Sequence, residues 1–320
     1  MKKRISVLTP CFNEEDNIEK IYLQVKIVMN EYSHYNYEHI FIDNCSIDNT
    51  VAILRQIALV DGNVKVIANA RNFGAVRSGY YGLIQCPGDA VIAIAADLQD
   101  PPILIKDFIT KWEEGYKLVL GIKEKSKENP IMFFIRNVFY TLMDKMADTE
   151  QISNFTGFAL YDKKFIDAIR QIDDPYPYFR GMVADLGFNR IEIAYTQQKR
   201  EKGKSSYNFY TLYDIAMQGF VNHSKVPLRL ASFIGFSIAI INLFIALFYL
   251  VYKLVYWQNF EVGMAPLVIG IFFFGGVQLF FLGIIGEYIG AIFTQVKKRP
   301  LVIEKERINF ELITEHGENS

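Results

Sequence analysis

The sequence lacks the glycine-rich loops with which many nucleotide-binding proteins hold phosphate. No G-x-G-x-x-G motif follows the first apolar segment, and no G-x-x-x-x-G-K-[ST] motif occurs in the 320 residues. We therefore expect neither a dinucleotide-binding site of the Rossmann type nor a P-loop. Any phosphate group that this protein binds must be held by other means.

Cysteines and histidines are few, and the net charge is small. The three cysteines form no C-x-x-C pair and no even set for a disulfide framework, which is typical of a reducing cytosol. The four histidines show no metal-ligand spacing. With 34 basic and 35 acidic residues the chain has no polybasic signature, so no nucleic-acid partner is expected.

The N-terminal residues do not have the pattern of a secretory signal. Met-Lys-Lys-Arg is followed by only a short apolar run before Thr9 and Pro10. A secretory signal needs an apolar core of roughly 7–15 residues and a small-residue cleavage site, and neither is present. We therefore expect the N-terminal domain to stay in the cytoplasm.

The first half of the chain alternates between short apolar segments and amphipathic helical patterns. Strands are predicted at 5–9, 39–42, 64–67 and 90–96, and helices at 17–31, 51–59 and 75–84. Repeated strand–helix units of this spacing predict a parallel sheet covered by helices, which is an α/β fold.

The later part of this region is less regular. The pattern predicts a helix at 103–113, a strand at 118–122, a strand or bend at 155–161 and a helix at 162–172. Residues 129–146 mix aromatic and aliphatic side chains with few acids, which is typical of an amphipathic helix. That helix either packs on the sheet or touches a membrane surface.

The apolar run 90–96 has the pattern of a strand buried on both faces. It ends in Asp97, Gln99 and Asp100, and two prolines then prevent the strand from continuing. Taken alone, this stretch is equally well explained as a solvated turn.

Polar residues follow three of the predicted strands at the point where each strand ends. They are Asn13 and Glu14, Asp43 and Asn44, and Asp97 and Gln99. Because the carboxyl ends of parallel strands lie at one edge of a sheet, these side chains are expected to converge on a pocket. Carboxylate, amide and water oxygens suit Mg²⁺ or Mn²⁺, which would bridge a diphosphate in place of a phosphate loop.

A basic loop at 199–207 precedes the apolar C-terminal part of the chain. A run of charges is usually a solvated face. The position of this loop favours another role, since each Lys or Arg near an anionic leaflet contributes on the order of 1 kcal/mol. Arg200 and Lys204 are therefore candidates to bind the phosphate of a lipid.

Two long stretches, 230–252 and 262–286, contain no charged residue. Each exceeds the ~20 residues needed to cross the hydrocarbon core, and two buried helices of a soluble protein are the alternative. The short connection predicts a helical hairpin. Basic residues flank its outer ends, whereas the connection has only Lys253, which places both ends in the cytoplasm. Residues 301–308 alternate loosely and are a candidate strand for a subunit contact.

Six motifs, together with the two apolar stretches, match the pattern of a known family. They are Thr9-Pro10-Cys11-Phe12-Asn13-Glu14-Glu15, the segment 42–50, Arg71-Asn72-Phe73-Gly74, the segment 96–102, Phe179-Arg180-Gly181 and the Arg200-x-x-Gly203-x-Ser205-x-Tyr207 segment. Over nearly its whole length, the chain resembles the membrane-anchored polyprenyl-phosphate (bactoprenol) glycosyltransferases. These belong to the family 2 inverting glycosyltransferases and are related to dolichyl-phosphate mannose synthase.

The resemblance implies a fold and a domain order. It implies a cytoplasmic GT-A domain at 1–206 with a parallel-rich sheet, a juxtamembrane amphipathic segment at 207–228, a transmembrane hairpin at 229–293 and a cytoplasmic tail at 294–320. The two spans would run from about 229 to 253 and from about 264 to 290. The protein is thus expected in the bacterial inner (plasma) membrane, as a multi-pass protein with both termini cytoplasmic and as a homo-oligomer.

The resemblance also implies an activity. The family transfers a hexose with inversion from a nucleotide-diphosphate sugar to a polyprenyl phosphate, with Mg²⁺ or Mn²⁺ as cofactor. For this chain we expect glucose from UDP-glucose and undecaprenyl phosphate. The lipid-linked sugar would then serve the modification of a cell-surface glycan.

Site residues carry over by position from the family's motifs. The donor would be bound by Pro10, Phe12, Glu14, Asp43, Asn44, Asn72 and Asp97. The acceptor phosphate would be bound by Arg200, Lys204, Ser205 and Tyr207. Asp97 and Gln99 would ligate the metal, and Asp97 and Arg200 are the predicted catalytic residues.

The chain departs from the family's pattern at three positions. Ala95 replaces the first aspartate of the central D-x-D, and Asn44 stands where a second aspartate is common. Gly157 replaces the aspartate proposed as a base. A phosphate monoester has its second pKa near ~6 and is already largely a dianion at neutral pH, so the acceptor needs positioning more than deprotonation. Mg²⁺ often relies on one carboxylate plus substrate phosphates. An active enzyme is therefore expected.

Two other functions stay open on the sequence alone. A processive polysaccharide synthase would have more spans and a Q-x-x-R-W motif, which does not occur in this chain. A catalytically impaired scaffold that binds a nucleotide sugar for a membrane partner would explain Ala95 and Gly157.

Overall fold

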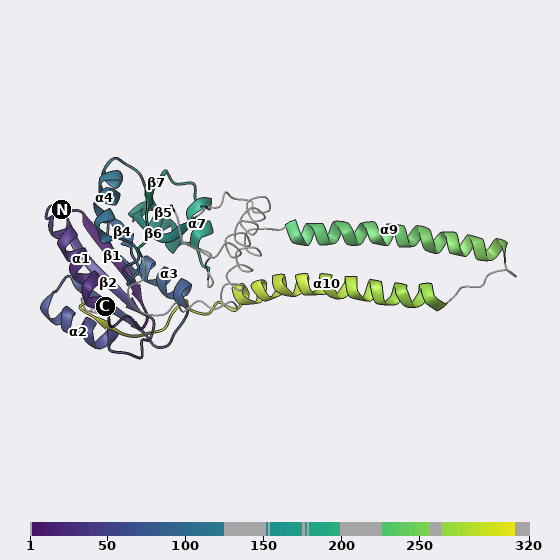
Figure 1. The fold of residues 1–320 in the computed structure, drawn as a ribbon, viewed down its shortest axis with the longest axis horizontal. Coiled ribbons are helices and arrows are strands. Elements are labelled where there is room, and N and C mark those ends of the chain that lie inside the picture. The colour runs from purple at the N-terminus through teal and green to yellow at the C-terminus, as the bar shows by residue number, and fades with distance from the viewer. Residues whose placement is uncertain are drawn as a thin grey trace, which may run out of the picture.

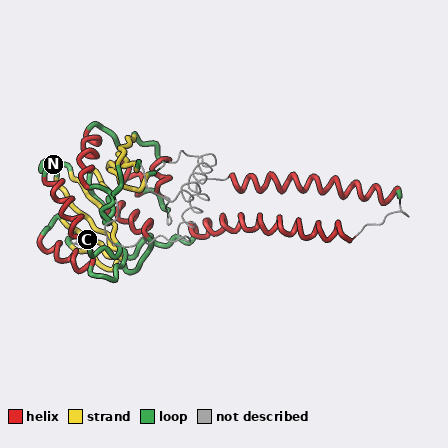
Figure 2. The backbone as a smooth tube through the Cα atoms, viewed as in Figure 1, coloured by secondary structure: helices red, strands yellow, loops and turns green. Residues whose placement is uncertain are grey.

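The computed structural model describes residues 2–124, 152, 154–174, 177, 179–198, 226–256 and 264–310. It consists of an α/β domain and a hairpin of two long helices that extends away from that domain (Figure 1). Helices surround the sheet of the domain, and loops join them at its edges (Figure 2). The predicted amphipathic helix at 129–146 lies outside the described residues.

One sheet of eight strands runs through the described part of the domain, in the order β7-β5-β6-β4-β1-β2-β3-β8. The strands are β1 Arg4–Cys11, β2 Asn36–Asp43, β3 Val64–Asn69, β4 Ala90–Ala93, β5 Leu118–Lys123, β6 Phe155–Asp162, β7 Arg190–Tyr195 and β8 Glu304–Ile308. β1 pairs in parallel with β2 and β4, and β3 continues this parallel half. β6 is antiparallel to β4 and β5, and β8 is antiparallel to β3.

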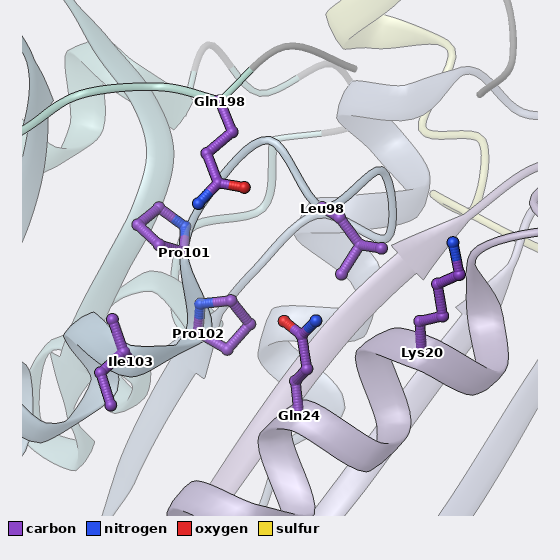
Figure 3. A pocket seen from close by; sticks show the side chains of 7 residues that line it. All are labelled: Lys20, Gln24, Leu98, Pro101, Pro102, Ile103 and Gln198. Atoms are coloured by element: carbon purple, nitrogen blue, oxygen red, sulfur yellow. The ribbon is translucent and has the colours of Figure 1, made fainter. Parts of the chain in front are cut away.

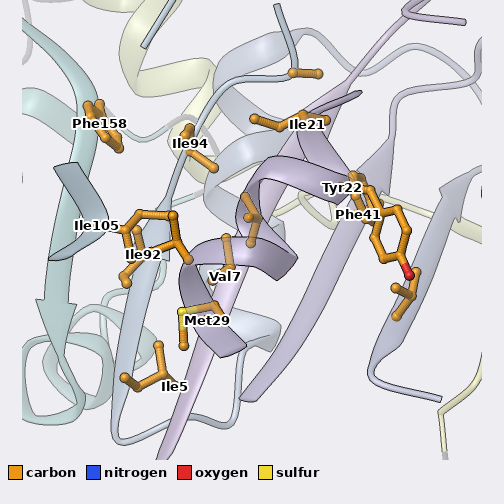
Figure 4. Packing of buried hydrophobic residues seen from close by; sticks show 14 of the residues in the cluster. Ile5, Val7, Ile21, Tyr22, Met29, Phe41, Ile92, Ile94, Ile105 and Phe158 are labelled. Carbon is orange, nitrogen blue, oxygen red and sulfur yellow. The ribbon is translucent and has the colours of Figure 1, made fainter. Parts of the chain in front are cut away.

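Helices cover both faces of the sheet. They are α1 Ile18–Asn30, α2 Thr50–Val60, α3 Ala75–Gln85, the 3₁₀ turn η1 Pro102–Leu104, α4 Ile105–Glu113, α6 Lys163–Arg170 and α7 Phe179–Asp185. α1, α2 and α4 share one apolar core with the sheet, and α3, α6 and α7 share the other. In the first core, Met29 of α1 lies beside Ile5 and Val7 of β1 (Figure 4). Apolar side chains of β1 point to both faces of the sheet and belong to both cores, as expected for a strand buried on both faces.

The predicted order of strands and helices in residues 5–123 is confirmed, with one change of length. The strand predicted at 90–96 ends at Ala93, although the Ile94 amide still donates to the Leu8 carbonyl at 2.9 Å. The last pair between β4 and β6 is Ala93 with Ala159. Two residues before Ala159, Gly157 has φ +103°, and β6 does not continue there as a regular partner. Residues 94–101 are therefore free to form a loop.

The strand predicted at 301–308 is present as β8, but its partner lies in the same chain. β8 pairs with β3, and the Ala70 amide donates to the Ile303 carbonyl at 2.8 Å. The segment thus covers the edge of the sheet within its own domain, where the sequence suggested a contact between subunits. An edge strand left open would be a template for aggregation.

The returning segment is also bonded to α3 along one stripe of that helix. Arg77, Tyr81 and Gln85 are spaced four residues apart and lie on one face. Arg77 donates to the Pro300 carbonyl at 2.8 Å, Tyr81 to Glu304 at 2.8 Å, and Arg307 donates to Gln85 at 2.7 Å. The end of the helical hairpin is therefore tied to the helix that begins beside the carboxyl edge of β3.

The hairpin consists of α9 Val226–Val255 and α10 Met264–Val296. Each contains an apolar stretch, of 28 and 27 residues respectively, long enough to cross a membrane. At ~1.5 Å per residue these stretches span roughly 40 Å, more than the ~30 Å hydrocarbon core. None of the most apolar part of either helix is buried within the structure, which does not fit core helices of a soluble protein.

The bonds around Glu304 predict a measurable contribution of β8 to stability. Glu304 accepts hydrogen bonds from Tyr81 and from both Nε and Nη2 of Arg307. We expect Glu304→Ala to lower the free energy of unfolding by about 1–2 kcal/mol, because Arg307 loses its carboxylate partner. The measurement is thermal and denaturant unfolding of the full-length protein in detergent. The matched control is Lys305→Ala, at an exposed position of the same strand; equal stability of the two variants would contradict the prediction.

Candidate active site

The loops that follow β1, β2, β3 and β4 lie at one edge of the sheet. These four strands are mutually parallel, so their carboxyl ends point the same way. The loops comprise residues 12–17, 44–49, 70–74 and 94–101. The prediction that the three polar strand ends meet at one edge is confirmed, and a ligand of this sheet is expected there.

The loops after β1 and β2 are held together by side chains that bond to backbone. Asn13 has φ +54° and exchanges two such bonds with the neighbouring loop: its amide donates to Ser46 Oγ at 2.8 Å, and its Oδ1 accepts from the Ile47 amide at 2.9 Å. The Glu14 amide donates to Thr50 Oγ1 at 2.9 Å. Asparagine tolerates the left-handed conformation better than most residues. The two loops therefore form one rigid wall of the site.

Two of the predicted donor-binding carboxylates also support these loops. Asp43 is 1% exposed and accepts from both the amide and the hydroxyl of Ser46, at 2.9 and 2.5 Å. Burial raises the pKa of Asp43, and the bonds from Ser46 oppose that shift. Glu14 is 8% exposed and accepts from Asn17 Nδ2 at 2.6 Å. Pro10 and Phe12, on the same wall, are half-buried.

Asn44 is the centre of a network of amides, and this network accounts for its departure from the family's pattern. Its Oδ1 accepts from the Phe73 amide at 2.9 Å and from Asn69 Nδ2 at 3.2 Å. Its Nδ2 donates to Asn72 Oδ1 at 2.9 Å, and that oxygen also accepts from the Gly74 amide at 2.8 Å. The backbone donors fix which way both amides point. An aspartate at position 44 would lack the donor that bonds to Asn72.

Asp97 lies in the loop after β4 and is partly exposed. Its Oδ1 accepts from the Gln99 amide at 3.2 Å, across Leu98, which has φ +58°. The Gln99 side chain donates to the Gln198 carbonyl at 3.4 Å, so its Oε1 is the end left for a cation. Ala95, where the family has its first aspartate, is exposed.

A divalent cation would rest on few protein ligands at this loop. Within the described residues, no group of three or more His, Cys, Asp or Glu side chains converges. Asp97 offers a carboxylate and Gln99 an amide oxygen, and the remaining positions would be filled by water and by phosphate oxygens of a ligand. Mg²⁺ and Mn²⁺ accept such a set, because they bind through one or two carboxylates together with substrate phosphates.

A cavity of about 330 Å³ lies between α1 and this loop (Figure 3). Lys20 and Gln24 of α1 line one side, and Gln198 lies over Pro101 on the other (Figure 3). The rest of its lining is Leu98, Pro102 and Ile103. None of the donor-binding residues predicted from the sequence lines it, so this cavity is a separate feature of the same loop.

The structure shows a pair of residues that the sequence analysis did not single out as a unit. The Tyr195 hydroxyl, at the end of β7, donates to Asp100 Oδ1, and both residues are buried. Burial raises the pKa of Asp100 to about 6; the bond from Tyr195 opposes this shift and the charge of Asp97 adds to it. In the sequence Asp100 is one of three polar residues that follow the apolar run 90–96, and nothing there distinguishes it as the partner of Tyr195.

Gly157 has a backbone that few other residues adopt. Its φ is +103°, and a Cβ added there would meet no atom within 4 Å. Space is thus available for the aspartate that the family has at this position, but the backbone conformation is unfavourable for it. The backbone conformation of β6 at position 157 therefore favours glycine over the aspartate of the family.

The predicted acceptor-binding residues Arg200, Lys204, Ser205 and Tyr207 lie outside the described residues. The chain is described up to Gln198, whose amide donates to the Gln99 carbonyl at 3.0 Å. The segment that leads to the basic loop is therefore bonded to the loop that carries Asp97.

The chain is similar to known glycosyltransferases over nearly its whole length. Residues 6–170 match the model of glycosyl transferase family 2. The chain is 34% identical to the uncharacterized glycosyltransferase YkcC of Bacillus subtilis, over 96% of this chain and 94% of that protein. It is 32% identical to the SfII prophage-derived bactoprenol glucosyl transferase of Shigella flexneri, over 95% and 98%. Among solved structures, glucosyl-3-phosphoglycerate synthase from Mycobacterium tuberculosis aligns at 17% identity with a TM-score of 0.47, over 68% of this chain and 76% of that one.

The conformation of Gly157 predicts the effect of adding a side chain there. We expect Gly157→Ala to lower the free energy of unfolding by about 1–3 kcal/mol, because an alanine is strained at φ +103°. Gly157→Asp should be destabilised similarly. The matched control is Gly62→Ala, where a Cβ also meets no atom but φ is not in this range; it should be neutral or slightly stabilising. Unfolding in denaturant measures all three, and an unchanged stability of Gly157→Ala would contradict the prediction.

The amide network predicts that Asn44 does not tolerate aspartate. In Asn44→Asp, a carboxylate oxygen would face Asn72 Oδ1 with no donor between them. We expect a loss of about 1–3 kcal/mol in the free energy of unfolding, because the buried side chain at position 44 would place an acceptor opposite the Asn72 oxygen and lose its bond. The control is Asn63→Asp at an exposed position after α2. If both variants unfold at the same denaturant concentration, the network does not have the role assigned to it.

Proposed function

The chain belongs to glycosyl transferase family 2, and we propose that it transfers a hexose from a nucleotide-diphosphate sugar to a polyprenyl phosphate. It is a glycosyltransferase, and the GT-A fold predicted from the sequence, followed by two helices long and apolar enough to cross a membrane, is confirmed. The observation that carries the proposal is the meeting of four loops at one sheet edge, with Asp97 among them.

Glucose as the sugar and undecaprenyl phosphate as the acceptor are the specific form of the proposal. A relative 32% identical over 95% of this chain is named a bactoprenol glucosyl transferase. UDP-glucose as the donor follows from the resemblance of the motifs. The lipid-linked glucose would then be consumed by a transferase that modifies a cell-surface glycan.

In the proposed mechanism, an oxygen of the acceptor phosphate attacks the anomeric carbon of the sugar. The new bond forms between that oxygen and the anomeric carbon, the bond from that carbon to the donor diphosphate breaks, and the nucleoside diphosphate leaves. Attack from the opposite side inverts the anomeric configuration. No proton must be removed, because a phosphate monoester is largely a dianion near neutral pH. A glycine at position 157 is compatible with this chemistry.

The residues of the chain have positioning and electrostatic roles in this reaction. The wall that receives the nucleotide and sugar would be formed by Pro10, Phe12, Glu14, Asp43, Asn44 and Asn72. Asp97 and Gln99 would hold the cation, which neutralises charge on the departing diphosphate when bound. Arg200, Lys204, Ser205 and Tyr207 would hold the acceptor phosphate in line with the donor.

The path of the chain supports a membrane-bound enzyme with its catalytic domain at one surface. α9 leads away from the domain, and α10 leads back to β8, which pairs with β3 of the same domain. The two ends of the hairpin must therefore lie on the same side of any membrane that it crosses. The excess of basic residues at these ends favours the cytoplasmic side. The domain boundaries, the inner-membrane location and the homo-oligomer stay predictions.

A catalytically impaired scaffold is the second candidate, and the single carboxylate at the metal position favours it. The two functions differ in one measurable respect. A scaffold would bind the nucleotide sugar without releasing nucleoside diphosphate, whereas the enzyme releases it only when the acceptor is present.

The proposed function predicts acceptor-dependent release of UDP. Full-length protein in detergent, with Mg²⁺ or Mn²⁺ and undecaprenyl phosphate, should release UDP from UDP-glucose, and mass spectrometry should show a hexosyl lipid. Asp97→Asn should reduce the rate by about 100-fold or more, since the carboxylate proposed to hold the cation is lost, and a chelator should do the same. The control Asp107→Asn alters an exposed aspartate on α4. Absence of release with every common UDP-sugar would refute the proposal and favour the scaffold.

A further inference from the structure

The end of β7 is fastened to the loop after β4 by three hydrogen bonds. The Tyr195 hydroxyl donates to Asp100 Oδ1. The Gln198 amide donates to the Gln99 carbonyl at 3.0 Å, and Gln99 Nε2 donates to the Gln198 carbonyl at 3.4 Å. Two segments almost a hundred residues apart in sequence are thus joined at the loop that carries Asp97.

Tyr195 is held firmly in place by its surroundings. It is 5% exposed, and its ring packs edge-to-face on Phe158 at 5.6 Å between centroids. Thr156 Oγ1 lies 3.3 Å from its hydroxyl. A Cβ added at Gly121 would lie 3.2 Å from Tyr195 Cε1, so the glycine makes room for the ring. The hydroxyl is therefore presented to Asp100 by a packed ring rather than by a mobile side chain.

Burial of the Asp100 carboxylate costs desolvation free energy that packing alone does not explain. Asp100 is 4% exposed, and a buried carboxylate, even one that accepts hydrogen bonds, is seldom more stable than an apolar residue of similar size. A polar bond of this kind fixes one arrangement of two segments, whereas apolar contact would permit several. The same loop holds Leu98 at φ +58°, a strained conformation that bonds on either side help to maintain.

The two joined segments are close in sequence to the residues proposed to bind the donor and the acceptor. Asp97 lies three residues before Asp100, and Arg200 lies two residues after Gln198. The bonds at Gln198 hold the described end of the segment that precedes the basic loop against the loop that carries Asp97. Productive transfer requires the acceptor oxygen within about 3.5 Å of the anomeric carbon, and small displacements there are costly.

We propose that Tyr195 and Asp100 are a positioning pair that holds residues 195–198, which precede the proposed acceptor-binding residues in the sequence, against the loop that carries Asp97. Neither residue touches a substrate in this role; the pair acts through the segments that it joins. The inference rests on the proposed transfer to a polyprenyl phosphate and adds to it the residues that bring the two substrates into register. Loss of the pair should impair use of the acceptor and leave binding of the donor unchanged.

The test separates these two effects with conservative variants. Tyr195→Phe and Asp100→Ala each remove the bond, whereas Asp100→Asn keeps an oxygen that accepts from the Tyr195 hydroxyl. The matched control is Tyr80→Phe, which removes the bond from another buried tyrosine, at 2.9 Å to the Ile169 carbonyl on the far side of the sheet. For each variant, kcat and KM for undecaprenyl phosphate, the Kd for UDP-glucose without acceptor, and the unfolding temperature are measured.

We expect kcat/KM for the acceptor to fall about tenfold or more in Tyr195→Phe and in Asp100→Ala, as for other losses of substrate alignment. The Kd for the donor should change by less than about twofold, and Asp100→Asn should retain most of the activity, because its acceptor oxygen preserves the bond. The double variant should be no worse than either single one, since both remove the same bond.

Several results would overturn the inference. A donor Kd that rises in parallel with the loss of acceptor use would show a general structural role, as would an equal loss in Tyr80→Phe. Additive losses in the double variant would show that the two residues act separately. If Asp100→Ala does not fold, the comparison of Tyr195→Phe with Asp100→Asn decides. Inactivity of the unaltered protein would refute the proposed function itself, whereas an active protein with unaffected variants refutes only the pair.

Discussion

β1 lies between β2 and β4 and pairs in parallel with both, with Leu8 opposite Ile40 on one side and Ala93 on the other. This pairing places the carboxyl ends of all three strands at one edge, and the rest of the molecule is arranged around it. The apolar residues of these strands are buried in two cores, which makes the register costly to change. The fixed register therefore brings the polar residues that follow these strands to the same edge of the sheet.

At that edge, several polar side chains form hydrogen bonds with the amides and hydroxyls of the loops. Asp43 accepts hydrogen bonds from the amide and hydroxyl of Ser46 in the loop that follows it, and Asn44 accepts from the Phe73 amide of the neighbouring loop. Backbone groups at strand ends lose their partners in the sheet and must be satisfied in another way. The result is a set of loops held in place before a substrate arrives, and such preorganisation is what a transfer reaction between two bound substrates requires.

The departures from the family's pattern have different physical characters. Asn44 is integrated in a network that an aspartate would break, and Gly157 has a backbone conformation that an aspartate would strain. Ala95 is exposed, and its surroundings in the described residues give no reason against an aspartate there. Two of the replacements are thus matched by their surroundings. This pattern is more consistent with an adapted enzyme than with gradual loss of function.

The sequence by itself determined the alternation of strands and helices, the polar strand ends and the two long apolar helices, because periodicity and length are local properties. Tertiary structure alone decided the end of β4 at Ala93, the pairing of β8 with β3 and the bond between Tyr195 and Asp100. Each of these depends on residues that are distant in the chain and meet only when the sheet is complete. A pattern along the chain shows which side chains are apolar or charged, but the partner of a buried carboxylate is set by the packing around it.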